Sequence, residues 1–345
     1  MNEREAPLFL DLVDLAAARL GGVALAASDD FFAEKENLLR PGRGVFLPDE
    51  FTDRGKWMDG WESRRKREAG HDWCVIRLGA PGVIRAVDVD TNHFLGNHPP
   101  FASLDAVHAP ATASLEELEQ AEWTEAIPEA PLRPGSQNLF SVDDRRAYTH
   151  VRLRIYPDGG VARLRVWGSV QPDWSRAADD LDDQARAHVA AGDVDVASLR
   201  NGGRALVCSD MFFGPMDNLI LPGRAENMGG GWETRRKRGP GHDWIVVRLG
   251  VAGTVSAVEI DTNHFKGNYP DRCALFGIHA PGARPTELVA PDAAWEPILG
   301  EQKLTAHARR FFQDQLVERG PFTHVRLDIF PDGGVSRLRV YGRPA

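Results

Sequence analysis

Short runs in which apolar and polar residues alternate recur along the chain and predict β-strands. Between residues 151 and 155, three apolar side chains alternate with two arginines, and residues 163–166 repeat this alternation. A period of two is typical of a strand with one face in the core and one face towards solvent. The intervening PDGG at 157–160 favours a tight turn, so we expect an antiparallel hairpin with a polar outer face.

Helical periodicity is scarce by comparison. The best helix candidate is SLEELEQAEW at 114–123. Most other apolar runs, such as CVIRLG and VIRAVDVDT, are short, rich in valine and isoleucine, and bounded by glycine or proline. The pattern therefore predicts an all-β protein with two tandem β-sandwich domains of the jelly-roll type.

The chain is an internal duplication, because long motifs recur, the central ones at an offset of 171 residues. The matching pairs are GWESRRKREAGHDWCVIRLG (60–79) with GWETRRKRGPGHDWIVVRLG (231–250), DTNHFLGNHP (90–99) with DTNHFKGNYP (261–270), 28–43 with 209–224, and 149–168 with 323–342. Solenoid repeats have periods of only 20 to 50 residues. We therefore expect two whole domains, at about 8–170 and 190–345, joined by a polar linker at 171–189 with one short helix.

The motif DTNHF follows a predicted strand in each copy. Asp90 and Asp261 lie on the strand face opposite the neighbouring apolar residues. Asparagine and histidine come next, so the loop would present a carboxylate, an amide and an imidazole, as loops at binding sites often do. The same residue types form turns, and a purely structural loop is an equal alternative. The phenylalanine is expected to pack beneath the loop.

The second repeated motif is a run of four basic residues, at 64–67 and 235–238. In a strand, alternate members would face opposite ways, and one or two could hold a small anion in a fork. A solvated edge strand is the alternative. Glu62 and Glu233, just before the run, could instead pair with it internally.

These motifs supply the candidate site residues. The catalytic candidates are Glu62, His71, Asp90 and His93 in the first copy and Glu233, His242, Asp261 and His264 in the second. The substrate-binding candidates are Arg64, Asn92, Asn97, Arg235, Asn263 and Asn268. The sequence contains neither the HxH nor the HExxH spacing that would indicate a metal site. We predict no cofactor, and a divalent metal stays open as an alternative.

Composition narrows the class of protein. A net charge of −9 argues against nucleic acid as a partner. No apolar run approaches the roughly 20 residues that cross a bilayer, and the N-terminus does not resemble a signal peptide. The three cysteines show no paired spacing, which is typical of reduced thiols. A cytoplasmic protein without membrane or nucleic-acid partners is the expectation.

The motifs WE(S/T)RRKR, GHDW, (I/V)DTNHF-GN-P and THVRL-I-PDGGV-RLRV, each present twice, resemble those of allantoicases. The resemblance covers nearly the whole chain in both copies. It implies a repeated jelly roll related to galactose-binding-like sandwiches, and a homo-oligomer. It also implies hydrolysis of the C–N bond of allantoate to (S)-ureidoglycolate and urea in purine degradation.

The residue types suit that chemistry. Arginine can hold the carboxylate of allantoate through two hydrogen bonds, and Asp and Asn match the ureido groups. Histidine or a carboxyl group can deliver a proton to departing urea and activate water. Our hypothesis is that the second ureido nitrogen expels the first urea, and that water attacks the resulting acylimine.

Several alternatives stay open at this stage. A non-catalytic carbohydrate- or small-anion-binding sandwich would show exposed aromatic residues, whereas four tryptophans at 61, 73, 232 and 244 are expected in the core. A pure oligomerisation scaffold is a further reading. Both copies could be active, or one alone, and Lys266, Arg309 and Arg310 make the second copy the more cationic. An insertion in the first copy, with Phe46, Phe51 and Trp57, could be a lid or an oligomer contact.

Overall fold

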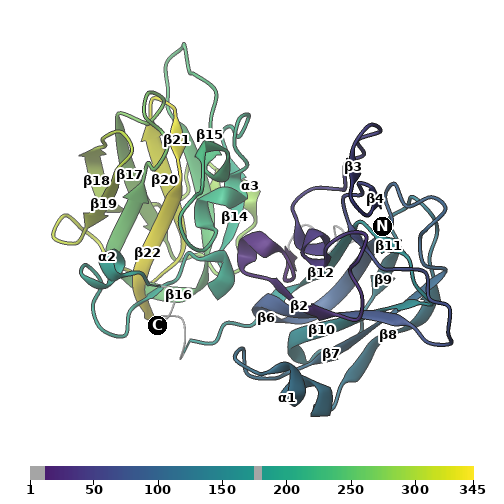
Figure 1. The fold of residues 1–345 in the computed structure, drawn as a ribbon. Coiled ribbons are helices and arrows are strands. Elements are labelled where there is room, and N and C mark those ends of the chain that lie inside the picture. Colours follow the sequence, from purple (N-terminus) through teal and green to yellow (C-terminus); the bar gives the residue numbers. More distant parts are fainter. Residues whose placement is uncertain (1–11, 175–180) are drawn as a thin grey trace, which may run out of the picture. The chain divides into compact units, whose positions relative to one another are not determined.

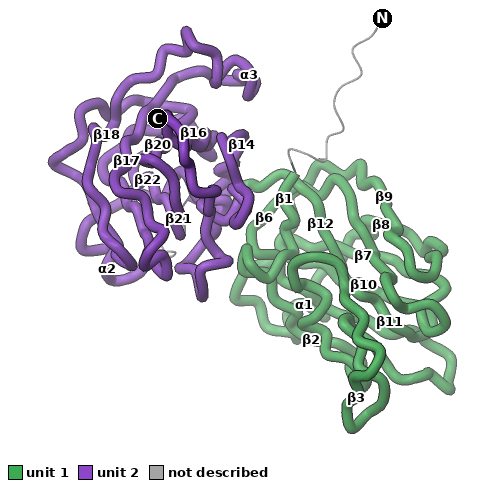
Figure 2. The backbone as a smooth tube through the Cα atoms, turned by 90° about the horizontal axis from the view of Figure 1, so that it is seen from above, with its two compact units in different colours: residues 1–171 green, residues 172–345 purple. Residues whose placement is uncertain are grey.

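A computed structural model describes residues 12–174 and 181–345, most of them in antiparallel strands (Figure 1). The chain divides into two compact units, residues 1–171 and 172–345 (Figure 2). The N-terminal decapeptide, the predicted domain start at residue 8 and residues 175–180 of the predicted linker lie outside the described residues.

Over residues 12–171, the first unit contains one α-helix and a series of strands, with 3₁₀ turns at Ala18–Leu20 and Lys35–Leu39. Its elements are β1 (Val13–Asp14), β2 (Val23–Ala27), β3 (Phe51–Thr52), β4 (Gly55–Lys56), β5 (Trp61–Glu62), β6 (Asp72–Asp90), β7 (Phe101–Val107), α1 (Leu115–Gln120), β8 (Thr124–Pro131), β9 (Leu139–Ser141), β10 (Ala147–Tyr156), β11 (Gly160–Val161) and β12 (Arg163–Val170).

Within its described residues, the second unit repeats this order without the β3–β4 pair and after an additional short helix, α2. Its elements are α2 (Asp183–Arg186), β13 (Val194–Asp195), β14 (Arg204–Cys208), β15 (Trp232–Glu233), β16 (Asp243–Asp261), β17 (Arg272–Ile278), α3 (Pro285–Leu288), β18 (Glu296–Lys303), β19 (Arg309–Phe312), β20 (Phe322–Phe330), β21 (Gly334–Val335) and β22 (Arg337–Pro344). Its 3₁₀ turns in the described residues include Leu199–Asn201, Met216–Ile220 and Met228–Gly230.

The long strand β6 joins the two layers of the first sandwich. Its first part, 72–77, pairs with β10 and β2, and its last part, 82–90, pairs with β12 and β9. β16 connects the second unit in the same way. Both ends of the strand therefore meet the turn between β10 and β12, because Asp72 pairs with Ile155 and Asp90 pairs with Arg163. The all-β fold with two tandem jelly-roll sandwiches is as predicted.

The predicted helix is confirmed, and the two predicted strands form as β10 and β12, but the hairpin is wrong, because each of these strands pairs with β6 and not with the other. Val151, Leu153 and Ile155 are fully buried, while the alternating arginines are half-buried. α1 begins at a capping box in which Ser114 and Glu117 satisfy each other's backbone N–H groups. The polar outer face is wrong at one position, because Arg163 is buried and forms an ion pair with Asp59 at 2.7 Å.

The three cysteines, Cys74, Cys208 and Cys273, form no disulfide. Within residues 12–174 and 181–345, no helix is both long enough and apolar enough to cross a membrane.

Candidate active site

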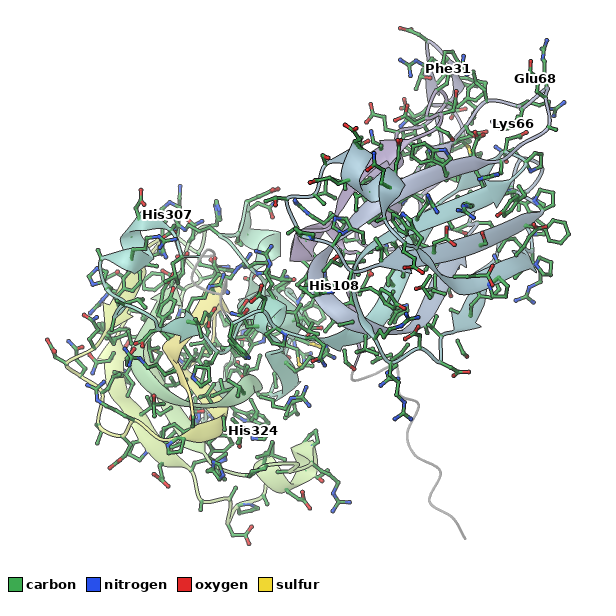
Figure 3. All side chains as sticks on the ribbon, turned by 90° about the horizontal axis from the view of Figure 1, so that it is seen from below. Phe31, Lys66, Glu68, His108, His307 and His324 are labelled. Atoms are coloured by element: carbon green, nitrogen blue, oxygen red, sulfur yellow. The ribbon has the colours of Figure 1, made fainter. Side chains whose placement is uncertain are left out.

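The repeated loops gather at one end of each unit, because β6 and β16 bring both of their ends there. Phe31, Lys66 and Glu68 lie at this end of the first unit, and His108 lies away from it (Figure 3). In the second unit, His307 lies at the loop end and His324 far from it (Figure 3). This end therefore carries the repeated DTNHF, WE(S/T)RRKR, GHDW and PDGG motifs.

The phenylalanine of the repeated motif is a structural residue. Phe94 and Phe265 are fully buried, as predicted. Each ring packs on a glycine of the PDGG turn, where an added Cβ at Gly160 or Gly334 would lie 2.0 Å from a ring carbon. Glycine at that position is therefore required by the close approach of the ring.

The motif aspartates are buried carboxylates, each held by an arginine. Asp90 accepts hydrogen bonds from Nε and Nη2 of Arg43 at 2.7 and 2.8 Å. Asp261 accepts from the same atoms of Arg224 at 3.1 and 3.4 Å. Both arginines are about half exposed, whereas both carboxylates are at most 2% exposed. The pairs thus present arginine, rather than carboxylate, to solvent.

The motif asparagines brace the neighbouring loop. The backbone N–H groups of Asn92 and Asn263 donate to the preceding aspartates at 2.9 and 2.8 Å. Their side-chain amides donate to the backbone carbonyls of Gly44 and Ala225. All the described contacts of these two amides are thus internal to the loop end.

The motif histidines take up a strained backbone conformation, with φ of 68° at His93 and 69° at His264. The ring of His93 stacks on Phe46 with centroids 5.6 Å apart. Nε2 of His264 lies 2.9 Å from the carbonyl oxygen of Ala225, and its backbone N–H donates to Nδ1 of His307. These contacts orient both imidazoles towards loop residues.

The glutamates before the basic run pair with asparagines across the loops rather than with the run. Oε1 of Glu62 accepts from Asn97 at 2.7 Å, and Oε1 of Glu233 accepts from Asn268 at 2.5 Å. Burial raises the pKa of the Glu62 carboxyl, and the hydrogen bond from Asn97 opposes this.

The basic run lies in a loop beyond β5 and β15, not in a strand. The backbone N–H of Lys66 donates to Asp158 of the PDGG turn, and its ammonium pairs with Asp72 at 2.8 Å. Lys237 makes the same two contacts with Asp332 and Asp243. Asp158 therefore ties the run to the turn.

Arg64 and Arg235 are also held internally, by Asp29 and Asp210. Their guanidinium groups lie over the exposed rings of Phe31 and Phe212, at 5.2 and 5.1 Å from the ring centroids.

The four tryptophans of the repeated motifs differ in burial. Those at 61 and 232 are fully buried, as predicted, and those at 73 and 244 are half-buried.

His71 and His242 lie at the start of the long strands and face different partners. His71 packs on the ring of Tyr156 with centroids 5.1 Å apart. Burial lowers its pKa, and the nearby Arg154 adds to this. Nε2 of His242 lies 3.0 Å from a carboxylate oxygen of Asp328. Neither histidine couples to the aspartate that follows it in the sequence.

Beside the Asp90–Arg43 pair, the first unit contains a cleft of about 300 Å³. Its lining includes three carboxylates, several arginines, an amide and a tryptophan: Asp14, Arg19, Arg43, Asp88, Asp90, Gln137, Arg163, Arg165 and Trp167. Arg165 is fixed by Asp14 and by the carbonyls of residues 40 and 42. Arg19 and Arg43 are the exposed arginines of the rim.

Asp88 is the unusual group of this cleft. Its side chain is 3% exposed, its Oδ2 accepts from Nε2 of Gln137 at 2.7 Å, and its Oδ1 has no hydrogen-bond partner. Burial raises the pKa of the Asp88 carboxyl to about 6; the hydrogen bond from Gln137 opposes this, and the nearby Asp90 adds to it. Such perturbed groups in clefts are common in active sites.

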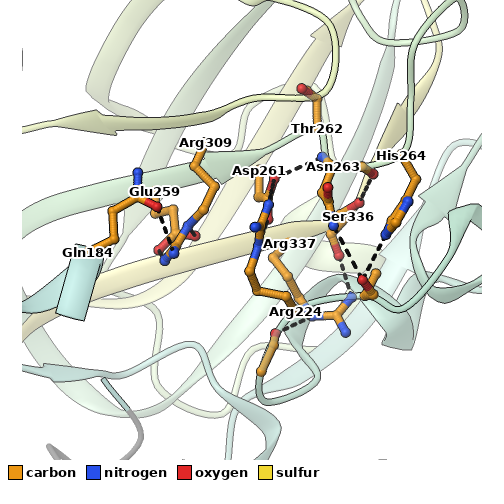
Figure 4. A network of polar contacts seen from close by, with 12 residues as sticks. Gln184, Arg224, Glu259, Asp261, Thr262, Asn263, His264, Arg309, Ser336 and Arg337 are labelled. Atoms are coloured by element: carbon orange, nitrogen blue, oxygen red, sulfur yellow. Dashed lines mark hydrogen bonds and ion pairs between the residues drawn. The ribbon is translucent and has the colours of Figure 1, made fainter. Parts of the chain in front are cut away.

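The corresponding cleft of the second unit is nearly filled, with a volume of about 40 Å³ (Figure 4). Glu259 stands at the position of Asp88 and Arg309 at that of Gln137. Arg309 donates to Glu259 at 2.7 and 2.9 Å and to Asp182 at 2.7 Å. Glu259 also accepts from the hydroxyl of Tyr341 at 2.7 Å. Every charge that distinguishes this cleft from the first is thus paired.

Sequence reasoning did not select the cleft residues outside DTNHF. The VDVD alternation placed Asp88 on the same strand face as Asp90, and the RPGR and LPGR matches contain Arg43 and Arg224. What the sequence could not show is that the loop at 40–43 folds over this strand face. Within the described residues, no group of three or more His, Cys, Asp and Glu side chains is placed to hold a metal ion.

The fold and the paired clefts define a tandem jelly-roll protein with an arginine–carboxylate cleft in each repeat. The family model described as "Allantoicase repeat" matches residues 13–171 and 194–345. A relative named "Probable allantoicase 1" from Burkholderia mallei is 48% identical, covering 99% of this chain and 98% of its own. "Probable allantoicase" from Pseudomonas aeruginosa is also 48% identical, covering 100% of this chain and 99% of its own.

Solved structures agree with this result. The crystal structure of allantoicase from Saccharomyces cerevisiae is 33% identical, with a TM-score of 0.74, covering 96% of this chain and 93% of its own. The chain therefore belongs to the allantoicase family.

Proposed function

We propose that this protein hydrolyses allantoate to (S)-ureidoglycolate and urea. The observation that carries the proposal is membership of the allantoicase family over the full length of both repeats. The cleft of the first unit suits such a substrate. Exposed arginines at its rim match a carboxylate, and Gln137 and Asp88 below can donate to and accept from planar ureido groups.

The test is direct. The purified protein is incubated with allantoate, and urea and ureidoglycolate are both quantified, with and without a chelator. Release of the two products in equal amounts supports the proposal, and chelator sensitivity would add a divalent metal. No turnover by a folded sample would contradict it and favour a carbohydrate- or small-anion-binding module instead.

We further propose that the protein acts in the cytoplasm as a homo-oligomer, without nucleic-acid or membrane partners. The three unpaired thiols suit a reducing compartment. The insertion of the first copy exposes Phe46 and Phe51, and exposed apolar side chains of this kind favour a subunit contact. Light scattering on the purified protein would measure the number of subunits.

A further inference from the structure

We propose that the cleft of the first unit is the only catalytic centre of the chain and that Asp88 is its general acid. In the second unit, by contrast, the corresponding cleft is closed by the chain's own segment at 181–189. This inference rests on the proposed hydrolysis of allantoate and assigns that reaction to particular residues.

The first observation is the unsatisfied oxygen of Asp88. A buried carboxyl normally has hydrogen-bond partners for both oxygens. Asp88 lines the cleft and accepts one hydrogen bond, from Gln137, while its Oδ1 is buried and has no partner. A substrate N–H group that reached this oxygen would satisfy it. At the same position in the second unit, Glu259 has partners on both oxygens, supplied by Arg309 and Tyr341.

The second observation is the segment that fills the other cleft. Leu181, Asp182 and Ala185 line what remains of it, and Ala185 packs against Ala257 and Tyr341. Asp182 brings a carboxylate to Arg309, whose guanidinium also contacts Gln184 (Figure 4). The cleft thus already holds an internal carboxylate beside Arg309, whereas Gln137 stands at this position in the first unit.

The groups facing Asp88 suit a proton donor. Asp90, charged and paired with Arg43, lies two residues along the same strand face and disfavours a second negative charge. Gln137 donates to Asp88, and the backbone of Asn138 and the guanidinium of Arg165 also favour its charged form. Two carboxyl groups whose environments differ in this way are typical of acid–base catalysis.

The reaction balances with Asp88 alone as the proton carrier. The lone pair of one ureido nitrogen forms a double bond to the central carbon, and the C–N bond to the other ureido group breaks. Asp88 gives its proton to the departing nitrogen, which leaves as urea. Water then adds its oxygen to the protonated acylimine, and its proton returns to the Asp88 carboxylate, giving ureidoglycolate.

The test compares equivalent positions in the full-length protein. Asp88→Asn should lower kcat by about 10²–10⁴-fold, whereas Glu259→Gln should keep the wild-type kcat. Because Glu259→Gln removes the partner of a buried arginine, Asp182→Asn serves as a second control that leaves Glu259 and Arg309 paired. Asp88→Glu should restore part of the rate lost in Asp88→Asn, which a purely structural role would not require.

Binding gives a readout independent of turnover. Titration calorimetry of Asp88→Asn with allantoate should show one molecule bound per chain. Two molecules per chain, wild-type kcat in Asp88→Asn, or equal losses in Asp88→Asn and Glu259→Gln would each overturn the inference. In all these cases, hydrolysis of allantoate by the wild-type protein would still support the proposed function. If the wild-type protein did not hydrolyse allantoate, the proposed function itself would be contradicted.

Discussion

The two clefts are built on the same strands and the same motifs, yet one has a volume of about 300 Å³ and the other about 40 Å³. Both keep the buried aspartate, its arginine and the packed phenylalanine. They differ at Asp88 and Gln137, which are Glu259 and Arg309 in the second unit, and in the segment at 181–189. The duplicated residues thus build the scaffold, and the positions that differ decide which cleft can admit a ligand.

The largest effect is expected from moving the second unit's arginine into the first. Gln137→Arg should pair with Asp88 as Arg309 pairs with Glu259. A neighbouring cation favours the ionised carboxylate, so the acid would have no proton to deliver. We expect kcat to fall by at least about 10²-fold in a steady-state assay of urea release.

The matched control is the reverse change. Arg309→Gln should keep the wild-type kcat, because its cleft takes no part in turnover on our proposal. Unchanged kcat in Gln137→Arg, with allantoate still bound at wild-type affinity, would contradict the role given to Asp88.

A smaller effect is expected at the rim. Arg43→Gln should raise KM by about 10–100-fold, since a hydrogen bond to a charged group contributes about 1.5–3 kcal/mol. Arg224→Gln should leave KM unchanged. Both variants strip a buried aspartate of its partner, so thermal unfolding should show similar losses of stability in the two. A rise of KM in Arg224→Gln would show that the second cleft also binds substrate.

The pH profile should show the acid directly. Asp88 works in its protonated form, and its pKa is raised to about 6. The rate should therefore be level below pH 6 and fall by about tenfold per pH unit above it, as the proton is lost. Asp88→Asn should abolish this limb. A level profile between pH 6 and 8 in the wild-type protein would exclude Asp88 as the titrating acid.

The sequence predicted the architecture well, for a physical reason. The alternation of apolar and polar residues along 151–155 and the Ser114–Glu117 capping box are local signals. In both segments the local conformational preference agrees with the structure in the fold. The site was harder to predict, because a cleft depends on which loops fold over which strand face. Asp88 was visible in VDVD, but its missing partner and its cover by the loop at 40–43 are tertiary facts.

The duplicated residues also have structural roles. Residues that appear twice, such as Asn92 with Asn263, brace the loops of both units. Lys266 of the second copy is exposed, but the extra positive charge of Arg309 is internal, because Arg309 pairs with Glu259 and Asp182. Arg310 likewise donates to a backbone carbonyl and lies over Phe312. Counting charges along a sequence therefore says little about which of them face a ligand.

The smallest effect is expected at the histidines of the repeated motif. The described lining of either cleft includes neither His93 nor His264. Both residues have positive φ, a conformation that asparagine adopts readily. His93→Asn and His264→Asn should therefore keep the fold and the wild-type kcat, as measured by urea release and thermal unfolding. A fall in kcat of about tenfold or more in His93→Asn alone would bring its imidazole into the first unit's chemistry, and the same fall in His264→Asn would reopen the second cleft as a catalytic centre.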